Sequence, residues 1–511
     1  MYLTAGLHRT IQRHPDQIAT VSGQRRQSYR TLVDRVSRSA SALRALGLQP
    51  GDRLALLAHN SDRLIELLLA AWWCGLVACP LNTRWSPQEI AYALQDCEAS
   101  ALGVDDACLG SVQSLTLPCL RTRLYIGELA NGPEGWLPWE PLVAIALPVP
   151  DTRCDPQTLA AIVYTGGTTG AAKGVMLSHA NIWASMVARL AVVPNPEHSA
   201  TLLISPLFHV AGLGRMVVQI MTGGTCVCLS GFDPVRVVQL MAQEGANDIM
   251  AVPSMLHVLL ETPGFDPGHL PNLERIIWGA APMPPALLRR ALARFPNAEF
   301  IHAYGMTETA ASVALLRVER SAAFLQSDRI RSVGRPTVAI EIQVTDEQGV
   351  AVPPGTPGEI RLKGPAVMQG YWGRPQETRS AFQDGWFCTG DAGIMDSQGY
   401  LYITDRLKDM IISGGENIYS TEVENALAQH PAVSASAVVG VPHPKWGEAV
   451  HAVVVFKPGL TAAPEALNAH CRSLIAGFKC PKSYEFQDHL PLTAAGKVAK
   501  NLLRQSAAPI G

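Results

Sequence analysis

Residues 164–179 read YTGGTTGAAKGVMLSH, and this stretch decides the fold class of the chain. Three glycines and three threonines fill positions 165–170, between an apolar segment at 159–163 and Lys173. Glycine lets backbone N–H groups converge on an anion, threonine hydroxyls add donors, and lysine adds positive charge. A strand that runs into such a loop predicts an α/β fold that holds a polyphosphate.

The spacing of this loop differs from two commoner nucleotide-binding loops. In a P-loop the lysine follows the last glycine directly, whereas Lys173 comes three residues after Gly170. The glycines also do not follow the dinucleotide fingerprint. A flexible turn between a strand and a helix is the simpler interpretation, but six consecutive Gly or Thr positions followed by a lysine favour a ligand loop.

Composition indicates a globular enzyme of at least two domains. The chain has 511 residues, more than single hydrophobic cores usually reach. Hydrophobic residues make up 48% and charged residues 16%, which excludes a largely disordered chain. A net charge of −2 gives no reason to expect nucleic acid or an anionic membrane surface as partner. The eleven scattered cysteines and the lack of an apolar signal near the N-terminus predict a cytoplasmic location.

The stretch 64–81 is almost wholly apolar and requires a test against a membrane span. It carries Glu66, Gly75 and Pro80, and a strand-like segment at 54–57 precedes it. Length and flanking residues favour a buried helix that leads into a buried strand.

Helical and strand-like segments alternate from about Tyr29 onward, which predicts a large N-terminal domain of parallel α/β sheets. Residues 331–403 are rich in Gly and Pro with short alternating strands, as in a small β-barrel-like unit. A compact α+β segment follows Asp405. We therefore expect an N-terminal domain at 1–404, a hinge at 405–409 and a smaller mobile α+β C-terminal domain at 410–511.

Further motifs follow the phosphate loop in a fixed order. They are PLFH at Pro206–His209, YGMTET at Tyr304–Thr309, GWFCTGD at Gly385–Asp391, DRLKDMIISGGENIYS at Asp405–Ser420 and GKVAK at Gly496–Lys500. In this order the motifs resemble the adenylate-forming superfamily, which comprises acyl- and aryl-CoA synthetases, luciferases and nonribosomal-peptide adenylation domains. The chain departs from many members at Gly167, where serine is frequent, and at Ala172, where proline is frequent.

The resemblance implies an ATP-dependent carboxylic acid:CoA ligase. A carboxylic acid and ATP would give acyl-AMP and pyrophosphate, and CoA would then take the acyl group and release AMP. Mg²⁺ would accompany ATP, CoA would be the co-substrate, and the partners would be small molecules, without nucleic acid or a transmembrane segment. Members of the superfamily often form homodimers, so the resemblance allows a homodimer here, while the sequence itself does not decide the oligomeric state.

The resemblance also assigns site residues. Lys497, Thr307, Glu308 and His209 are the expected catalytic group, with Glu308 as the Mg²⁺ ligand and His209 as a gate of the acid tunnel. Lys497 would bridge the carboxylate and the α-phosphate, while Asp391 and Arg406 would hold the ribose. The expected ATP- and AMP-binding residues are Thr165, Gly166, Gly167, Thr168, Thr169, Gly170, Lys173, Gly279, Ala280, Ala281, Ala303, Tyr304, Gly305, Asp391 and Arg406.

The expected acid pocket is small and apolar. Its residues are Phe208, Val210, Gly212, Leu213, Met306 and Ala310. A second charge on the substrate would be buried unpaired among them, so an apolar monocarboxylic acid of fatty or aryl (cinnamic) type is expected. Lys408 would be the hinge residue for a rotation of the C-terminal domain between the two half-reactions. CoA would contact Gly414, Gly415, Trp446, Phe478 and Lys482.

Four other functions fit parts of the pattern. Amino-acid-activating domains place an Asp directly after the Phe of the gate, and His209 at that position argues against this class. A ligase that loads a carrier protein stays open, and so does an oxygen-using luciferase. A non-catalytic nucleotide-binding protein is disfavoured because Lys497, Asp391 and Glu308 are all present.

Overall fold

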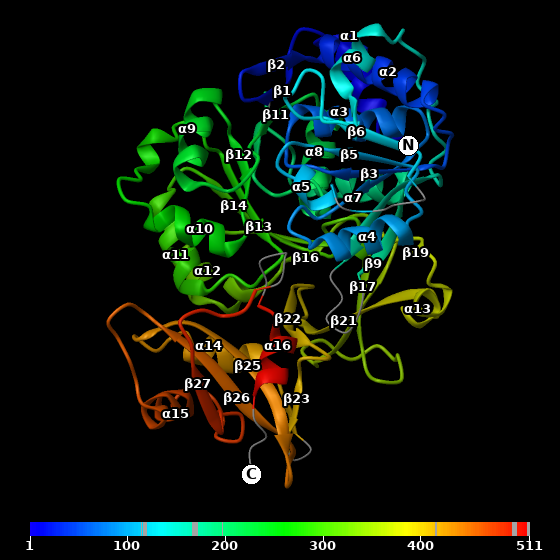
Figure 1. Cartoon of the computed structure of the whole chain (residues 1–511). Coiled ribbons are helices and arrows are strands. Elements are labelled where there is room, and N and C mark those ends of the chain that lie inside the picture. The colour runs from blue at the N-terminus through cyan, green and yellow to red at the C-terminus, as the bar shows by residue number, and fades with distance from the viewer. Residues whose placement is uncertain are drawn as a thin grey trace. The chain divides into compact units, whose positions relative to one another are not determined.

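The computed structural model describes residues 1–113, 115, 120–165, 172–196, 198–413, 416–492 and 498–507 (Figure 1). It divides into two compact units. The first comprises 1–165, 172–341 and 363–380, and the second comprises the described parts of 342–362 and 381–511. The expected domain borders at 404 and 410 stay predictions, because this division groups residues 381–404 with the C-terminal segment.

The first unit contains a nine-stranded sheet with five consecutive parallel pairs. Antiparallel strands close it at both edges. In spatial order its strands are β16 (Arg335–Pro336), β15 (Ala314–Arg317), β14 (Glu299–Tyr304), β13 (Arg275–Gly279), β12 (Asp248–Met250), β10 (Ala200–Leu203), β11 (Thr225–Cys228), β1 (Ile18–Ser22) and β2 (Arg25–Ser28).

An eight-stranded sheet forms the second layer of strands in this unit, and it is parallel from β8 to β7. Its order is β19 (Gly370–Tyr371), β9 (Lys173–Ser178), β8 (Leu159–Thr165), β4 (Val77–Pro80), β3 (Arg53–Leu57), β5 (Ala101–Val104), β6 (Thr122–Tyr125) and β7 (Leu137–Pro138). The alternation of strand and helix in the sequence therefore folds as expected, and the predicted fold class is confirmed.

Helices connect the strands of both sheets, and Figure 1 shows α9, α10 and α11 together beside β12, β13 and β14. The longer helices are α1 (Ala5–Arg13), α2 (Tyr29–Ala45), α3 (Asp62–Trp73), α4 (Pro87–Asp96), α7 (His179–Val192), α8 (Val210–Thr222), α9 (Pro234–Glu244), α10 (Pro253–Glu261) and α11 (Pro285–Arg294). The shorter ones are α5 (Leu109–Val112), α6 (Trp139–Ile145), α12 (Ala322–Gln326), α13 (Pro375–Ser380), and the 3₁₀ turns η1 (Pro267–His269), η2 (Thr307–Thr309) and η3 (Asp328–Arg331).

Helix ends follow the local sequence. Ser61 accepts a hydrogen bond from the backbone of Leu64 and so begins α3, and a Ser86–Glu89 capping box begins α4. All residues of α3 are buried, as expected for the apolar stretch. Among the described residues no helix is long and apolar enough to cross a bilayer.

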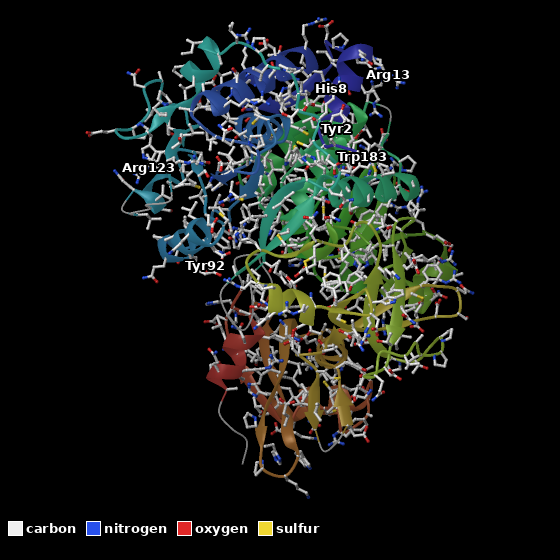
Figure 2. All side chains as sticks on the ribbon, turned by 90° about the vertical axis from the view of Figure 1, so that its right-hand side faces the viewer. Tyr2, His8, Arg13, Tyr92, Arg123 and Trp183 are labelled. Carbon is white, nitrogen blue, oxygen red and sulfur yellow. The ribbon has the colours of Figure 1, made fainter. Side chains whose placement is uncertain are left out.

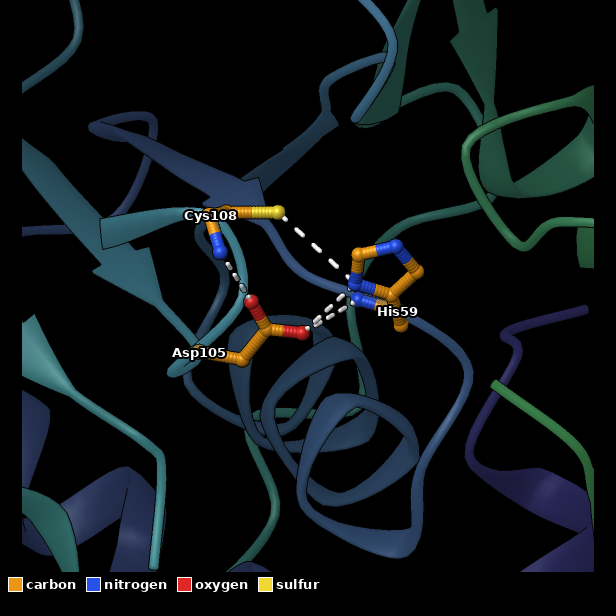
Figure 3. Close-up of side chains that lie close together, drawn as sticks. All are labelled: His59, Asp105 and Cys108. Carbon is orange, nitrogen blue, oxygen red and sulfur yellow. Dashed lines mark hydrogen bonds and ion pairs between the residues drawn. The ribbon is translucent and has the colours of Figure 1, made fainter. Parts of the chain in front are cut away.

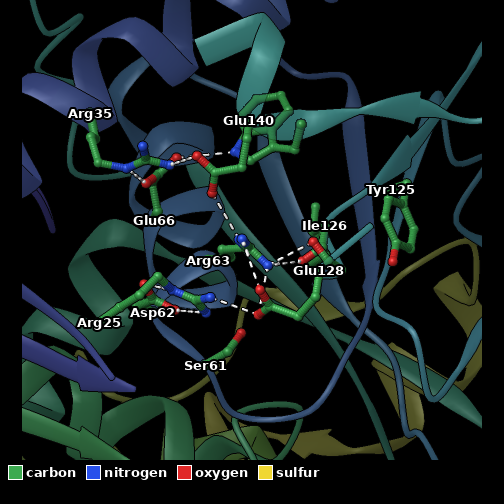
Figure 4. A network of polar contacts seen from close by, with 12 residues as sticks. Arg25, Arg35, Ser61, Asp62, Arg63, Glu66, Tyr125, Ile126, Glu128 and Glu140 are labelled. Carbon is green, nitrogen blue, oxygen red and sulfur yellow. Dashed lines mark hydrogen bonds and ion pairs between the residues drawn. The ribbon is translucent and has the colours of Figure 1, made fainter. Parts of the chain in front are cut away.

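A polar network joins the hairpin β1–β2 to helices α3 and α6 (Figure 4). Arg25 binds the buried carboxylate of Asp62 through two nitrogens, at 2.7 and 2.8 Å. Arg63 donates to Glu140 at 2.8 Å and to Glu128 at 3.0 Å. The paired guanidinium and carboxylate groups offset the cost of each other's burial. The network therefore connects the hairpin β1–β2 to helices α3 and α6.

The second unit contains two further sheets. A five-stranded antiparallel sheet consists of β17 (Glu341–Thr345), β18 (Gly358–Lys363), β20 (Phe382–Gln383), β21 (Trp386–Met395) and β22 (Leu401–Arg406). The other five-stranded sheet consists of β23 (Ile411–Ser413), β24 (Glu416–Ile418), β25 (Val433–His443), β26 (Gly447–Phe456) and β27 (Ser483–Phe486). Helices α14 (Ser420–Leu427), α15 (Pro464–Arg472) and α16 (Lys500–Ser506) accompany the latter.

A buried charge cluster lies at the amino ends of β12 and β13. Asp248 is fully buried and pairs with Arg215. Guanidinium nitrogens of Arg275 and Arg189 lie 3.7 and 4.0 Å from Asp248 Oδ2. Thr201 donates to the same carboxylate at 2.9 Å. Asp248 therefore offsets part of the charge of several buried guanidinium groups, and Glu299 pairs with Arg275 at 3.0 Å.

We expect Asp248→Asn to lower the free energy of unfolding by about 3–5 kcal/mol, because removing one partner leaves buried charges uncompensated. Urea unfolding followed by circular dichroism measures this loss. Glu261→Gln is the matched control, since Glu261 pairs with Arg290 at an exposed position. This variant should lower the free energy of unfolding by less than about 1 kcal/mol. Equal stabilities of the two variants would contradict the assigned role of Asp248.

Candidate active site

Three of the segments expected to bind ATP or the acid leave the same edge of the nine-stranded sheet. Strands β10, β13 and β14 are parallel, and their carboxyl ends lead to the PLFH segment, to Gly279 and to Tyr304. The chain proceeds from β10 to β11 on one side and to β12 on the other, so the strand order reverses beside β10. Ligands of open parallel sheets bind outside the carboxyl ends at such a point.

The first turn of α8 and the PLFH segment carry most of the expected acid pocket. Phe208 is buried and its ring centroid lies 4.5 Å from that of His209, the residue that precedes α8. A side chain at Gly212 would put its Cβ 2.2 Å from the carbonyl oxygen of Pro206. Only glycine therefore lets the helix begin this close to the segment, and Leu213 follows as a buried residue.

The segment after β14 closes on itself. A Cβ at Gly305 would lie 1.5 Å from the carbonyl oxygen of Ala311, so no larger residue fits. Thr309 bonds the backbone N–H and C=O of Met306, both at 3.1 Å. Ala310 has a φ of 51°, a conformation that costs energy for a residue other than glycine. Strain of this kind is common where a loop is held in place for binding.

The turn after β13 lies beside this segment. Gly279 pairs with Ala303 of β14, and a Cβ at Gly279 would lie 2.4 Å from the carbonyl oxygen of Ala303. Ala280 has a φ of 64°. Gly279 and Ala303 thus lie together, with Ala280 and Ala281 following the strand end and Tyr304 ending β14.

Helix α4 holds both flanks of the glycine- and threonine-rich loop. Thr165 ends β8 and Lys173 begins β9, and the two residues are paired across this hairpin. Tyr164 donates to Asp96 at 2.8 Å, and Tyr92 (labelled in Figure 2) donates to the carbonyl oxygen of Ala172 at 3.1 Å. Gly166, Gly167, Thr168, Thr169 and Gly170 lie outside the described residues.

Tyr371 joins the two sheets of the first unit at the site. Its hydroxyl donates to Glu308 Oε1 at 3.0 Å, and Lys173 Nζ lies 5.1 Å from the centroid of its ring. The backbone oxygen of Glu308 also accepts from Met368 at 2.8 Å. The structure therefore brings Glu308, beside Thr307 in η2, close to the lysine that follows the phosphate loop.

The expected ribose-binding pair lies on adjacent strands of the second unit. Asp391 of β21 and Arg406 of β22 are directly opposed, and Arg406 Nε lies 2.6 Å from Asp391 Oδ1. The carboxylate is 4% exposed while the guanidinium is 42% exposed. Asp391 is thus a charge-paired group that can accept further hydrogen bonds.

Two ion pairs connect helix α16 to the expected hinge and to helix α14. Arg504 binds Asp409 at 2.8 Å, and Lys500 binds Glu424 at 2.7 Å. Burial of Lys408 lowers the pKa of its ammonium, because the charged form loses hydration. Lys497 lies outside the described residues. Helix α16 begins three residues after Lys497, and its two ion pairs connect it to Asp409 and to Glu424 of α14.

The described residues expected to contact CoA fall into two places of the second unit. Trp446 stacks on His443 with ring centroids 4.1 Å apart, and Lys482 Nζ lies 5.7 Å from the Trp446 ring. Phe478 is 46% exposed and lies beside Lys479. Gly414 and Gly415 are outside the described residues, but Ser413 before them pairs with Gly447, next to Trp446.

Two residues at the site escaped the sequence analysis. Tyr371 belongs to no motif quoted above. Asn60 follows β3 of the other sheet, and its side chain makes three hydrogen bonds to residues 203–207, where β10 leads into the PLFH segment. It donates to the carbonyl oxygens of Leu203 and Ser205 at 2.9 and 3.0 Å and accepts from Leu207 N at 2.9 Å. The only signal in the sequence is a polar residue directly after a buried strand, which is too common to single it out.

Comparisons with known proteins assign the family. Residues 7–372 match the model of the AMP-binding enzyme family, and 422–497 match that of the AMP-binding enzyme C-terminal domain. Feruloyl-CoA synthase of an Amycolatopsis species is 39% identical over 492 residues, 96% of each chain. Fatty acid–[acyl-carrier-protein] ligase ScoC of Streptomyces coeruleorubidus is 34% identical over 96% of this chain and 94% of the other. The crystal structure of ATP-bound MatB from Rhodopseudomonas palustris matches with a TM-score of 0.89 at 33% identity, covering 99% of each chain.

The chain therefore belongs to the AMP-binding enzyme family. It is an adenylate-forming enzyme of acyl-CoA synthetase type, an acid–thiol ligase whose reaction joins a carboxylic acid to CoA by way of acyl-AMP. The predicted family, reaction class and enzyme class are confirmed. The roles of individual residues stay predictions.

We expect Asn60→Ala to raise the KM for the acid by about tenfold, with little change in the KM for ATP. The variant removes the Asn60 partner of the carbonyl oxygens of Leu203 and Ser205 and of the N–H of Leu207 in the PLFH segment, a loss of about 1–3 kcal/mol for each buried group that finds no other partner. Steady-state pyrophosphate release at varied acid and varied ATP separates the two constants.

Asn247→Ala is the matched control for this prediction. Asn247 is also buried, and its side chain accepts from Ala200 N at 2.9 Å, at the opposite end of the same strand β10. Its loss should lower stability and leave the KM for the acid unchanged. A similar rise in KM for both variants would mean that Asn60 acts only through the stability of the sheet.

Proposed function

We propose that the enzyme activates an apolar monocarboxylic acid of fatty or aryl (cinnamic) type and transfers it to CoA. The observation that carries this proposal is the chemistry of the carboxyl edge around α8. Phe208, Val210, Leu213, Met306 and Ala310 there are all apolar. A second charge on the acid would lose its hydration without gaining a partner. The 39% identity to feruloyl-CoA synthase supports an aryl acid, and the 34% identity to a fatty acid ligase supports an aliphatic one.

In the first half-reaction the acid's carboxylate attacks the α-phosphate of ATP, and pyrophosphate leaves. The two reacting groups are anions, so positive charge and hydrogen-bond donors must offset the charge that develops. We assign this to Lys497, to the hydroxyl of Thr307 and to the loop at 165–170 with Lys173. We assign Tyr304 to cover the adenine, and Asp391 with Arg406 to hold the ribose. A carboxylate is already ionised at neutral pH, so His209 gates the tunnel and need not act as a base.

Glu308 fits the binding of Mg²⁺. Mg²⁺ in such enzymes takes one or two carboxylates together with phosphate oxygens and waters. The Tyr371 hydroxyl holds one oxygen of Glu308 and so orients the carboxylate. When bound, Mg²⁺ neutralises part of the charge on the phosphates.

In the second half-reaction the thiol of CoA attacks the acyl carbon and AMP leaves. We propose Lys408 as the hinge for a rotation of the C-terminal domain, 410–511, between the two steps. Trp446, Phe478 and Lys482, with the glycines at 414 and 415, would contact CoA. A homodimer stays open, and a cytoplasmic location stays a prediction of the sequence.

A carrier protein in place of CoA is the second candidate. It is favoured by one observation, the likeness to an acyl-carrier-protein ligase over almost the whole chain. A non-catalytic nucleotide-binding protein is disfavoured because Lys497, Asp391 and Glu308 are all present.

Pyrophosphate release with Mg-ATP over a panel of fatty, benzoic and cinnamic acids, with and without CoA, tests the proposal. We expect one apolar class to support turnover that requires CoA, and a Lys497→Ala variant to lose this turnover. Adenylate that forms with an apolar acid but is discharged only by a holo carrier protein would favour the second candidate. Turnover confined to dicarboxylic or amino acids would contradict the proposed substrate class.

We expect Glu308→Gln to lower kcat about a hundredfold and to raise the Mg²⁺ concentration needed for half-maximal rate, because the charge is lost while the acceptor for Tyr371 is kept. Mg²⁺ titrations of pyrophosphate release measure both. Tyr371→Phe is the control that keeps the carboxylate and removes its hydrogen bond. An unchanged Mg²⁺ response in Glu308→Gln would mean that a group other than Glu308 binds the metal.

A further inference from the structure

Three side chains that could bind a metal converge after β3 and β5 of the eight-stranded sheet. They are His59, Asp105 and Cys108, and their ligand atoms all lie within 4.8 Å of one another. Figure 3 shows the thiol of Cys108 and the carboxylate of Asp105 both directed at the imidazole of His59. Nothing in the proposed adenylation or thioester chemistry uses them.

The distances suit a tetrahedral ion. His59 Nδ1 lies 3.0 Å from Asp105 Oδ2 and 3.8 Å from Cys108 Sγ. Zinc bonds of about 2.0–2.3 Å to nitrogen, oxygen and sulfur require ligand atoms about 3.3–3.6 Å apart at tetrahedral angles. Shifts of a few tenths of an ångström therefore convert these two contacts into two edges of a zinc site, and the third pair, Asp105 and Cys108, lies within 4.8 Å.

The backbone already orients the carboxylate for this role. Asp105 Oδ2 accepts from His59 N at 2.8 Å, and Asp105 Oδ1 accepts from Cys108 N at 2.9 Å. These outer hydrogen bonds are of the kind that hold metal-binding carboxylates in place. Cys108 is buried, and Asp105 and His59 are 19% and 34% exposed, so an ion has access from one side.

The position in the sheet is one where ligands bind. The chain passes from β3 to β4 on one side and then to β5 on the other, so the strand order reverses between β3 and β5. His59 and Asp105 follow the carboxyl ends of these two strands. Strand β8, which leads into the phosphate loop, ends at the same edge two strands away, about 10 Å at usual strand spacing.

A hydrogen-bonded histidine–aspartate pair alone would explain two of the three residues. The thiol of Cys108 adds a third possible ligand to this pair, with its Sγ 3.8 Å from His59 Nδ1. One thiolate and one carboxylate together balance the charge of a divalent cation. Arg84 is a positively charged residue that acts on His59 from the neighbouring segment. Its charge lowers the affinity of the site for any cation.

We propose that His59 Nδ1, Asp105 and Cys108 Sγ bind a zinc ion, with water at the fourth position. The combination of thiolate, imidazole and carboxylate selects Zn²⁺ over Mg²⁺, which prefers oxygen ligands alone. Binding releases the thiol proton of Cys108 to solvent, and the imidazole binds with its proton on Nε2. Asn60, next to His59, holds the PLFH segment, so the ion would stiffen the turn on which that segment rests.

Metal content and cobalt spectra of the full chain test this inference, and neither readout needs turnover. Protein stripped with a chelator is dialysed against zinc in excess Mg²⁺ and its zinc counted by mass spectrometry. We expect one zinc per chain in the wild type and a loss of at least tenfold in zinc affinity in Cys108→Ala and Asp105→Asn. Cobalt in place of zinc should show a thiolate charge-transfer band that Cys108→Ala lacks.

Cys154→Ala is the matched control. Cys154 is also a buried thiol, donates to the carbonyl oxygen of Trp72 and does not belong to the cluster. It should keep the zinc and the cobalt band. Circular dichroism checks that each variant is folded, and Asp105→Asn keeps an oxygen acceptor if Cys108→Ala does not fold. A wild type without stoichiometric zinc, or equal zinc in all variants, would overturn the proposal.

Discussion

Parallel strands joined by crossover helices place all their carboxyl ends on one edge of a sheet, and the site of this enzyme depends on that constraint. In the nine-stranded sheet it brings together the PLFH segment, Gly279 and Tyr304, which lie far apart in the sequence. In the eight-stranded sheet it brings Thr165, the last residue before the phosphate loop, to the same edge as His59 and Asp105. Residues of separate motifs therefore meet without any long loop.

Two side chains connect these edges within the first unit. Asn60 spans from the end of β3 to the end of β10, and Tyr371 spans from Glu308 to Lys173. Each acts on a segment with a predicted chemical role. A buried amide that makes three hydrogen bonds to one segment holds its position more firmly than apolar contacts do, because each bond has a required direction.

In the second unit, side-chain contacts hold the residues expected to act in the second half-reaction. Asp405 directly precedes Arg406, the last paired residue of β22, and its carboxylate accepts from the hydroxyl of Ser420 at 2.7 Å. The ion pairs of Arg504 and Lys500 then connect α16 to Asp409 and to Glu424, both on the C-terminal side of the expected hinge residue. A rotation at Lys408 would thus carry α16 as one body with α14 and its sheet.

The sequence by itself determined the family, the α/β class and the order of the motifs, because glycine, threonine, lysine and acidic residues at fixed spacing act locally on one ligand. It also indicated correctly that the apolar stretch at 64–81 is a buried helix and strand. Only the tertiary structure decided that Asn60 holds the PLFH segment and that His59 meets Asp105 and Cys108. These contacts join residues 46 or more positions apart, and sheet order brings them together, which single-sequence periodicity does not encode.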